Sequence, residues 1–335
     1  MATGKDEVYT GSNRLRYKFP TIMPWAKEPS PNFSHLFSIA LTKLEETPSR
    51  SRPMTKTKEN FQLHFIGIGP QKNGSTWLHE VLACHPQILL PSGTKETMFF
   101  DKYYDKGEAW YTDYFPKMND PQQRVGEIGP TYFTCEKAIE RIKRLSPNCK
   151  IIISLRNPVA RAISLHHHHL NKGRVSPVFQ DAVQKMPEIL ESGHYSQYLP
   201  KWMDAFGSSQ IHIVFLDDIQ NNKQEVWQDL CKFLGVSPVP MPNRAYEKVN
   251  AKRMSKYPWL ARAGVEVAIK MREYKLHGLV ETLKKAGLEK IYSGGEARIL
   301  PLSAQDIEWL RNLYEKDVQY LEQLTHKDLS GWRHF

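Results

Sequence analysis

The chain has 335 residues, of which 40% are hydrophobic and 24% charged, and its net charge is +10 with a pI of about 9.2. This composition excludes a wholly disordered chain, and the length is sufficient for one large domain or two small ones. The excess of positive charge indicates an anionic partner, for which nucleic acid, phosphorylated cofactors and acidic sugars are candidates. A basic, solvated surface without a partner is the alternative.

Cysteine usage and hydropathy predict the compartment. The four cysteines show neither C-x-x-C spacing nor the density of a disulfide scaffold. No apolar run has the length of a membrane span, and the first twenty residues lack the apolar core of a signal peptide. We therefore expect a soluble, cytoplasmic protein in a reducing environment.

Two regions differ in composition. Residues 1–58 are polar and basic with scattered prolines, which predicts an N-terminal extension that is partly disordered or wraps the domain. Residues 59–335 are expected to form one domain.

The first predicted element is a strand within Phe61–Ile68, followed by a turn and a helix over 75–83. A strand, a glycine-containing turn and a helix N-terminus together form an anion site, to which Lys72 adds a full positive charge. The stretch nearly fits the nucleotide-phosphate pattern G-x-x-x-x-G-K-[ST], but Ser75 occupies the place of the lysine. This departure argues against an ordinary ATPase or kinase.

Further strands and helices alternate along the chain. A short strand at 88–90 precedes Lys95 and Glu96, which should lie on the same rim as Lys72 because parallel strands end at one edge. A helix over 137–145 precedes an almost wholly apolar strand, Lys150–Leu155. Asn157 is placed to cap the next helix, so that Arg156 and Ser164 can converge on one anion.

The second half of the domain continues the alternation, with a strand at 211–216 and helices at about 222–234 and 303–324. The sequence therefore predicts a single α/β domain with a P-loop-like, mostly parallel central sheet and helices on both faces. The four consecutive histidines, His166 to His169, fall within a helix and point in different directions, so we expect no metal cluster there.

Two motifs resemble those of sulfotransferases that use 3′-phosphoadenosine 5′-phosphosulfate (PAPS). The run from Lys72 to Leu78 resembles the phosphosulfate loop P-K-x-G-T-T-W-L, and the run from Arg156 to Ser164 fits R-[ND]-P-x-x-R-x-x-S. A weaker likeness to K-E-x-H-F-F-D, at residues 95–101, points to the carbohydrate-type and bacterial members.

The resemblance implies a role for each matching residue. Lys72 would be catalytic, and Glu96 would be the general base for in-line attack on a sulfuryl group of PAPS, without a metal. The residues implied in donor binding are Lys72, Asn73, Gly74, Ser75, Thr76, Trp77, Arg156, Ser164, Tyr195, Lys252 and Arg253. Tyr195 is alternatively a core tyrosine with a satisfied hydroxyl.

The acceptor is less determined. Met98 stands where carbohydrate-type members have histidine, and Ile128 where they often have lysine. These departures favour a small-molecule hydroxyl or amine over an oligo- or polysaccharide, which is the alternative. A dense aromatic segment over 103–115 either lines an acceptor pocket or packs a loop. His166 to His169, or His194, are rival bases.

Two other classes of function remain open. One is a P-loop nucleotide kinase with a displaced lysine, and the other is a non-catalytic binder of polyanions. The resemblance favours neither, and it implies no nucleic-acid or membrane partner.

Overall fold

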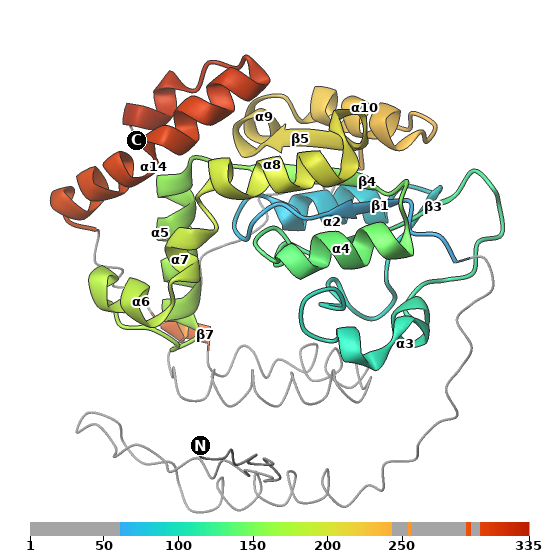
Figure 1. Ribbon diagram of the computed structural model, residues 1–335, viewed down its shortest axis with the longest axis horizontal. Coiled ribbons are helices and arrows are strands. Elements are labelled where there is room, and N and C mark those ends of the chain that lie inside the picture. Colours follow the sequence, from blue (N-terminus) through green and yellow to red (C-terminus); the bar gives the residue numbers. More distant parts are fainter. Residues whose placement is uncertain (1–60, 243–253, 256–292, 296–301, 335) are drawn as a thin grey trace, which may run out of the picture. The chain divides into compact units, whose positions relative to one another are not determined.

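The computed structural model describes residues 61–242, 254–255, 293–295 and 302–334 (Figure 1). The predicted N-terminal extension and the candidate donor residues Lys252 and Arg253 lie outside these ranges. Among the described residues, no helix is long and apolar enough to cross a bilayer.

The centre of the structure is a five-stranded sheet with strand order β2-β3-β1-β4-β5. Its strands are β1 (Phe65–Gly67), β2 (Ile88–Leu89), β3 (Arg124–Ile128), β4 (Lys150–Leu155) and β5 (Ile211–Phe215). All four pairings are parallel, with Phe65 opposite both Gly126 and Lys150. The predicted parallel sheet is thus confirmed, and the carboxyl ends of its strands lie at one edge, where α/β proteins place their sites.

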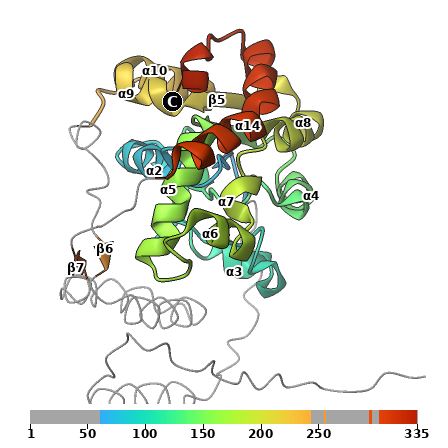
Figure 2. The ribbon, with the colours of Figure 1, turned by 90° about the vertical axis from the view of Figure 1, so that its left-hand side faces the viewer.

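Alternation along the strands divides the core into two layers. Phe65, Ile152 and Val214 pack with α2 (Ser75–Ala83), α9 (Leu216–Asn221) and α10 (Lys223–Leu234). Ile66 and Ile151 point to the opposite face, where they pack with α4 (Glu136–Leu145), α8 (Tyr195–Phe206) and α14 (Ala304–Thr325). Figure 2 shows α2, α9 and α10 on one side of the sheet and α4 and α8 on the other. This is the two-sided covering that an apolar parallel sheet requires.

A smaller apolar cluster lies beside the sheet. Helices α5 (Pro158–Asn171), α6 (Phe179–Lys185) and α7 (Glu188–Glu191) pack there with Leu310 and Tyr314 of α14. Asn157 caps α5 as predicted, because its side-chain oxygen accepts hydrogen bonds from the backbone of Val159 and Ala160.

The long, strongly patterned elements were predicted well, and the short or polar ones were not. Helix α2 begins and ends at the predicted residues, and α14 is capped by Ser303 as expected. Strand β3 was missed because Gly126 and Glu127 interrupt its apolar pattern. Also unpredicted are α3 (Glu108–Thr112), α6, α7, α9, the 3₁₀ turns η1 (Tyr104–Lys106), η2 (Ser208–Gln210) and η4 (Ser330–His334), and the antiparallel pair β6 (Met254–Ser255) and β7 (Ser293–Gly295).

The aromatic segment after Asp101 packs a loop onto the domain. Tyr111 and Phe115 are buried, and the Phe99 ring stacks on Tyr111 with centroids 4.7 Å apart. The sequence left open whether this segment lines an acceptor pocket or packs a loop, and for these buried rings the structure supports packing.

The chain directly after β1 passes so close to β4 that one added methyl group, at Gly69, should destabilise the protein. A Cβ added at Gly69 would lie 2.4 Å from the backbone nitrogen of Ser154 and 2.5 Å from its carbonyl oxygen. Backbone atoms of a central strand cannot move aside, so Gly69→Ala should lower the free energy of unfolding by about 1–3 kcal/mol. Chemical denaturation checks this. Gly331→Ala is the control, since its added Cβ meets no atom within 4 Å, and equal stabilities of the two variants would contradict the prediction.

Candidate functional site

The loop between β1 and α2 has the backbone geometry of an anion cradle. Lys72 and Gly74 both adopt positive φ, 77° and 92°, immediately before α2 begins at Ser75. This geometry turns the chain so that the first amides of α2 have no helical partner and face the loop. Asn73 is fully buried, and its amide donates to the carbonyl of Ser154 at 3.0 Å, which fastens the loop to β4.

Arg156 follows β4 and meets this loop. Its guanidinium donates to the carbonyl oxygen of Lys72 at 3.4 Å. The hydroxyl of Tyr195 in turn donates to the carbonyl of Arg156 at 2.7 Å and lies 3.5 Å from the Asn73 amide. Tyr195 is fully buried, so it supports Arg156 and the loop as a core tyrosine with a satisfied hydroxyl.

Three cations gather at this edge of the sheet. Burial, and then the charges of Arg156 and Lys95, lower the pKa of Lys72, while burial chiefly lowers the pKa of Arg156. Among the described residues, no carboxylate lies within ion-pair distance of Lys72 or Arg156. Neighbouring, partly desolvated cations of this kind are stabilised by a bound polyanion. The residues therefore fit a donor with several phosphate and sulfate groups.

Lys95 links the donor loop to Glu96. Its ammonium lies 3.3 Å from the hydroxyl oxygens of both Ser75 and Thr76, and 3.4 Å from a carboxylate oxygen of Glu96. Glu96 thus lies on the same rim as Lys72, as predicted, and its side chain is 23% exposed. A carboxylate that is both held in place and accessible can take a proton from an incoming acceptor.

The remaining predicted residues have more ordinary surroundings. Trp77 is 6% exposed and packs in the core beneath α2, and Ser164 is half-buried on α5. Arg161, in the same motif as Arg156, is fully buried and donates to Ser192 Oγ at 2.9 Å and to the Ile189 carbonyl at 2.5 Å. It fastens α5 to the end of α7.

One carboxylate at the site was missed. Glu127, at the end of β3, is fully buried and accepts the backbone N–H of Thr97 at 2.5 Å. Burial raises the pKa of Glu127 to about 7, against the opposing hydrogen bonds from Thr97 and Tyr111, and the charge of Glu96 adds to the rise. The available signal was a glutamate inside an otherwise buried strand, which requires buried partners.

The histidine run lies along the second half of α5. His166 Nε2 lies 3.0 Å from the carbonyl of Ser176, and burial lowers the pKa of His168 to about 3 and that of His169 to about 4. The charges of Lys172, Arg174 and Lys72 add to both shifts. Within the described ranges, no group of three or more His, Cys, Asp or Glu side chains could hold a metal ion.

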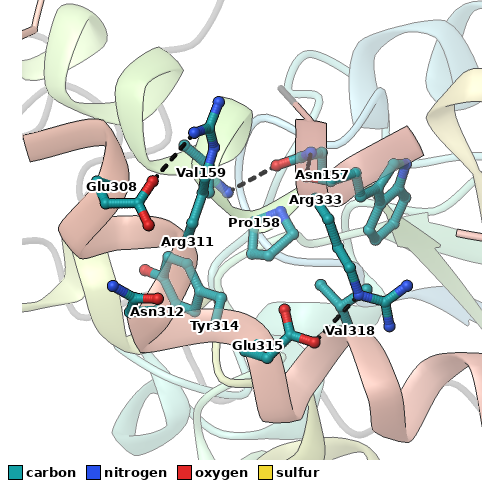
Figure 3. Close-up of a pocket in the computed structure, with 11 residues that line it drawn as sticks. Asn157, Pro158, Val159, Glu308, Arg311, Asn312, Tyr314, Glu315, Val318 and Arg333 are labelled. Carbon is teal, nitrogen blue, oxygen red and sulfur yellow. Dashed lines mark hydrogen bonds and ion pairs between the residues drawn. The ribbon is translucent and has the colours of Figure 1, made fainter. Parts of the chain in front are cut away.

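The segment near residue 332 contacts the start of α5. The Asn157 amide donates to the carbonyl of Trp332 at 2.9 Å, and the Trp332 indole donates to Asp217 at 2.5 Å. A cavity of about 180 Å³ lies here (Figure 3). It is lined by Asn157, Pro158, Val159, Glu308, Arg311, Asn312, Tyr314, Glu315, Val318, Trp332 and Arg333, and none of the predicted donor residues belongs to this lining.

Comparison with known proteins finds similar chains among curated proteins and among solved structures. The chain is 32% identical over 194 residues to the human bifunctional heparan sulfate N-deacetylase/N-sulfotransferase 2, covering 52% of this chain and 22% of that protein. It is 34% identical over 157 residues to the mouse heparan sulfate glucosamine 3-O-sulfotransferase 6, covering 44% of each. The chain therefore spans less than half the length of these relatives. A sulfotransferase structure from Alicyclobacillus acidocaldarius shares the fold, with a TM-score of 0.58 at 23% identity, covering 82% of this chain and 99% of that one.

The expected preference for a small-molecule acceptor is wrong, because these curated relatives are named for a polysaccharide. The structure shows the surroundings of the two residues on which this expectation rested. Ile128 is 1% exposed and packs in the core of the sheet, where it faces Gly67. Met98 adopts a φ of 54°, and its carbonyl accepts two backbone N–H groups in a turn.

The match to a family completes the comparison. The model of the sulfotransferase domain covers residues 63–286, which include β1, the donor loop, the loop of Glu96 and the Arg156 motif. The fold predicted from the sequence is the fold of the solved relative. This chain belongs to the sulfotransferase domain family.

Proposed function

We propose that this protein transfers a sulfuryl group from PAPS to a hydroxyl or amine of an acidic, glucosamine-containing oligo- or polysaccharide. The observation that carries the acceptor proposal is the positive charge that directly follows the end of α5. Lys172 and Arg174 lie close enough to His168 and His169 to lower the pKa of both, and so does Lys72 of the donor loop. The names of the curated relatives point to the same class of acceptor.

This cationic strip, defined by Lys172 and Arg174, suits a polymer that carries carboxylates and sulfates. Clustered charge of one sign attracts an oppositely charged polymer and concentrates it at the surface. The charges of the strip and the charge of Lys72 act on the same two histidines, so the strip and the donor loop lie close together. An acidic glycan bound at the strip would therefore pass close to Lys72.

The donor, PAPS, carries two anionic groups: the 5′-phosphosulfate, from which the sulfuryl group is transferred, and the 3′-phosphate. In the proposal, Lys72 and the first amides of α2 bind the phosphosulfate, and Lys72 stabilises charge that grows on the departing phosphate. Arg156 binds the 3′-phosphate, with Ser164 two turns further along α5. Tyr195 keeps Arg156 in place through its backbone carbonyl.

Glu96 takes the acceptor proton as sulfur is attacked. Its carboxylate lies beside Lys95, which in turn contacts the hydroxyls at the start of α2, so the base and the donor loop share one cation. The histidines are weaker candidates. His168, with a pKa of about 3, is a weaker base than an ordinary glutamate, and His194 Nδ1 lies 3.1 Å from a carboxylate oxygen of Asp317.

Adenosine 3′,5′-bisphosphate should bind and stabilise the protein. At a hundredfold excess over its dissociation constant, the free energy of unfolding should rise by about 2.7 kcal/mol. Arg156→Ala should weaken this binding because a charge-assisted phosphate contact is lost, whereas Lys72→Ala should also lower turnover at saturating donor. Calorimetry and steady-state rates measure the two effects. An unchanged melting temperature at saturating bisphosphate would contradict the donor site.

Glu96→Gln should lower turnover by about 10²–10⁴-fold, because the amide has nearly the same shape but cannot take a proton. Bisphosphate affinity should stay the same, since the side chain faces the acceptor. Glu140→Gln, at an exposed glutamate of α4, is the matched control. Near-normal turnover of Glu96→Gln together with an inactive His168→Asn or His194→Asn would transfer the role to that histidine.

The acceptor is tested by donor consumption with N-unsubstituted and N-sulfated glucosaminyl polymers, phenols and steroids, followed by mass spectrometry. Polymers should be sulfated, and the double variant Lys172→Ala/Arg174→Ala should raise the polymer KM roughly two- to thirtyfold at low salt. The control is Lys185→Ala, at an exposed lysine of α6. Sulfation confined to phenols or steroids would refute the acceptor class and leave the sulfotransferase assignment intact.

A further inference from the structure

The end of β3 carries a buried carboxylate that the mechanism above does not use. Glu127 Oε1 accepts the Thr97 backbone N–H at 2.5 Å and the Tyr132 hydroxyl at 3.3 Å, while Oε2 accepts the Tyr111 hydroxyl at 3.1 Å. Its side chain is fully buried. All three contacts come from hydrogen-bond donors, so the ionised carboxylate is the form that can accept them together.

These contacts determine the backbone of the loop that carries the proposed base. Thr97 follows Glu96 directly, and its Oγ1 accepts the N–H of Phe99 at 3.2 Å. The same Oγ1 lies 3.4 Å from the Tyr132 hydroxyl. Glu96 is therefore held on one side by Lys95, which contacts the donor loop, and on the other by Thr97, which is bonded to Glu127.

We propose that Glu127 is a positioning residue for sulfuryl transfer, whose ionised carboxylate holds Thr97 and thereby orients Glu96 toward the acceptor. This inference rests on the proposed role of Glu96 as the base. Protonation of Glu127 turns one accepting oxygen into a donor, so the three surrounding donors can no longer all be satisfied. The loop then loses a charge-assisted bond next to the base.

The surroundings of Glu127 predict that turnover depends on pH in a specific way. The charged and titratable groups near the cluster are His64 before β1, Lys95, Glu96 and Asp101 on the loop, Tyr111 on α3, Tyr132 after β3, Arg141 on α4 and Cys149 before β4. Burial raises the pKa of Tyr111, Tyr132 and Cys149, so these three stay neutral between pH 6 and 8, and burial lowers the pKa of His64. Glu127, with a pKa of about 7, changes charge in that interval.

Turnover should therefore rise with pH as Glu127 ionises, by about tenfold between pH 6 and 8 for a single group that titrates near 7. The test measures kcat over this interval with PAPS and an N-sulfated glucosaminyl polymer, whose blocked amines do not titrate. Glu127→Gln keeps an amide oxygen for the Thr97 N–H but cannot ionise. We expect its kcat profile to be flat and its affinity for adenosine 3′,5′-bisphosphate to be unchanged.

A second variant should change the pKa of Glu127 while leaving Glu127 itself in place. The Tyr111 hydroxyl favours the ionised carboxylate through its hydrogen bond, so Tyr111→Phe should shift the midpoint of the rise to higher pH. The matched control is Tyr198→Phe, which removes a buried tyrosine's 2.5 Å hydrogen bond to Glu191, away from the loop. Its profile should match that of the unmodified protein.

The outcomes separate this inference from the assignment of the base. If Glu96→Gln keeps its turnover, the base assignment fails. If Glu96→Gln is inactive while Glu127→Gln keeps the wild-type rise, Glu127 has no positioning role. Should Glu127→Gln fail to bind the bisphosphate because it does not fold, Tyr111→Phe decides, and an unshifted midpoint overturns the proposal. In the Glu96→Gln background, Glu127→Gln should lower kcat no further, whereas a purely structural role would lower it again.

Discussion

The burial of Lys72 between the charges of Lys95 and Arg156 is the constraint on which the functional edge of this protein depends. Parallel pairing brings the ends of β1, β2 and β4 to one edge, and each of these strands leads to one of the three cations. The described contacts hold two of them: Lys95 lies near the hydroxyls of Ser75 and Thr76 and pairs with Glu96, and Arg156 donates to the carbonyl of Lys72. An anionic donor adds negative charge beside Lys72 and Arg156, and its binding therefore stabilises both the site and the fold.

Buried side chains hold the segments that carry these cations in place. Asn73 fastens the donor loop to β4, and Tyr195 reaches the Arg156 carbonyl from α8. Arg161 secures the end of α7, two residues before the glycine that leads into α8. The position of each cation at this site therefore depends on hydrogen bonds made by buried residues elsewhere in the core.

The sequence predicted the parts of this arrangement that local patterns encode. The glycine-containing turn after β1 and the Asn157-Pro158 start of α5 have fixed backbone requirements, so Lys72 and Arg156 were found at the same edge. Glu127 was not found, because its partners Thr97, Tyr111 and Tyr132 come from three separate segments. The acceptor was misjudged because Met98 and Ile128 were compared with family patterns position by position, whereas the structure places Ile128 in the core, where it packs against the sheet.

The hydrogen bond between Asn157 and Trp332 joins residues 175 positions apart. Closing so long a loop is entropically unfavourable and slow, so this contact belongs to the late stages of folding. During synthesis on the ribosome, the sheet and the donor loop are complete long before Trp332 emerges from the exit tunnel. The support that this tryptophan gives to the start of α5 and to Asp217 therefore becomes available only after Trp332 has left the tunnel, so the surroundings of Arg156 are completed later than the donor loop.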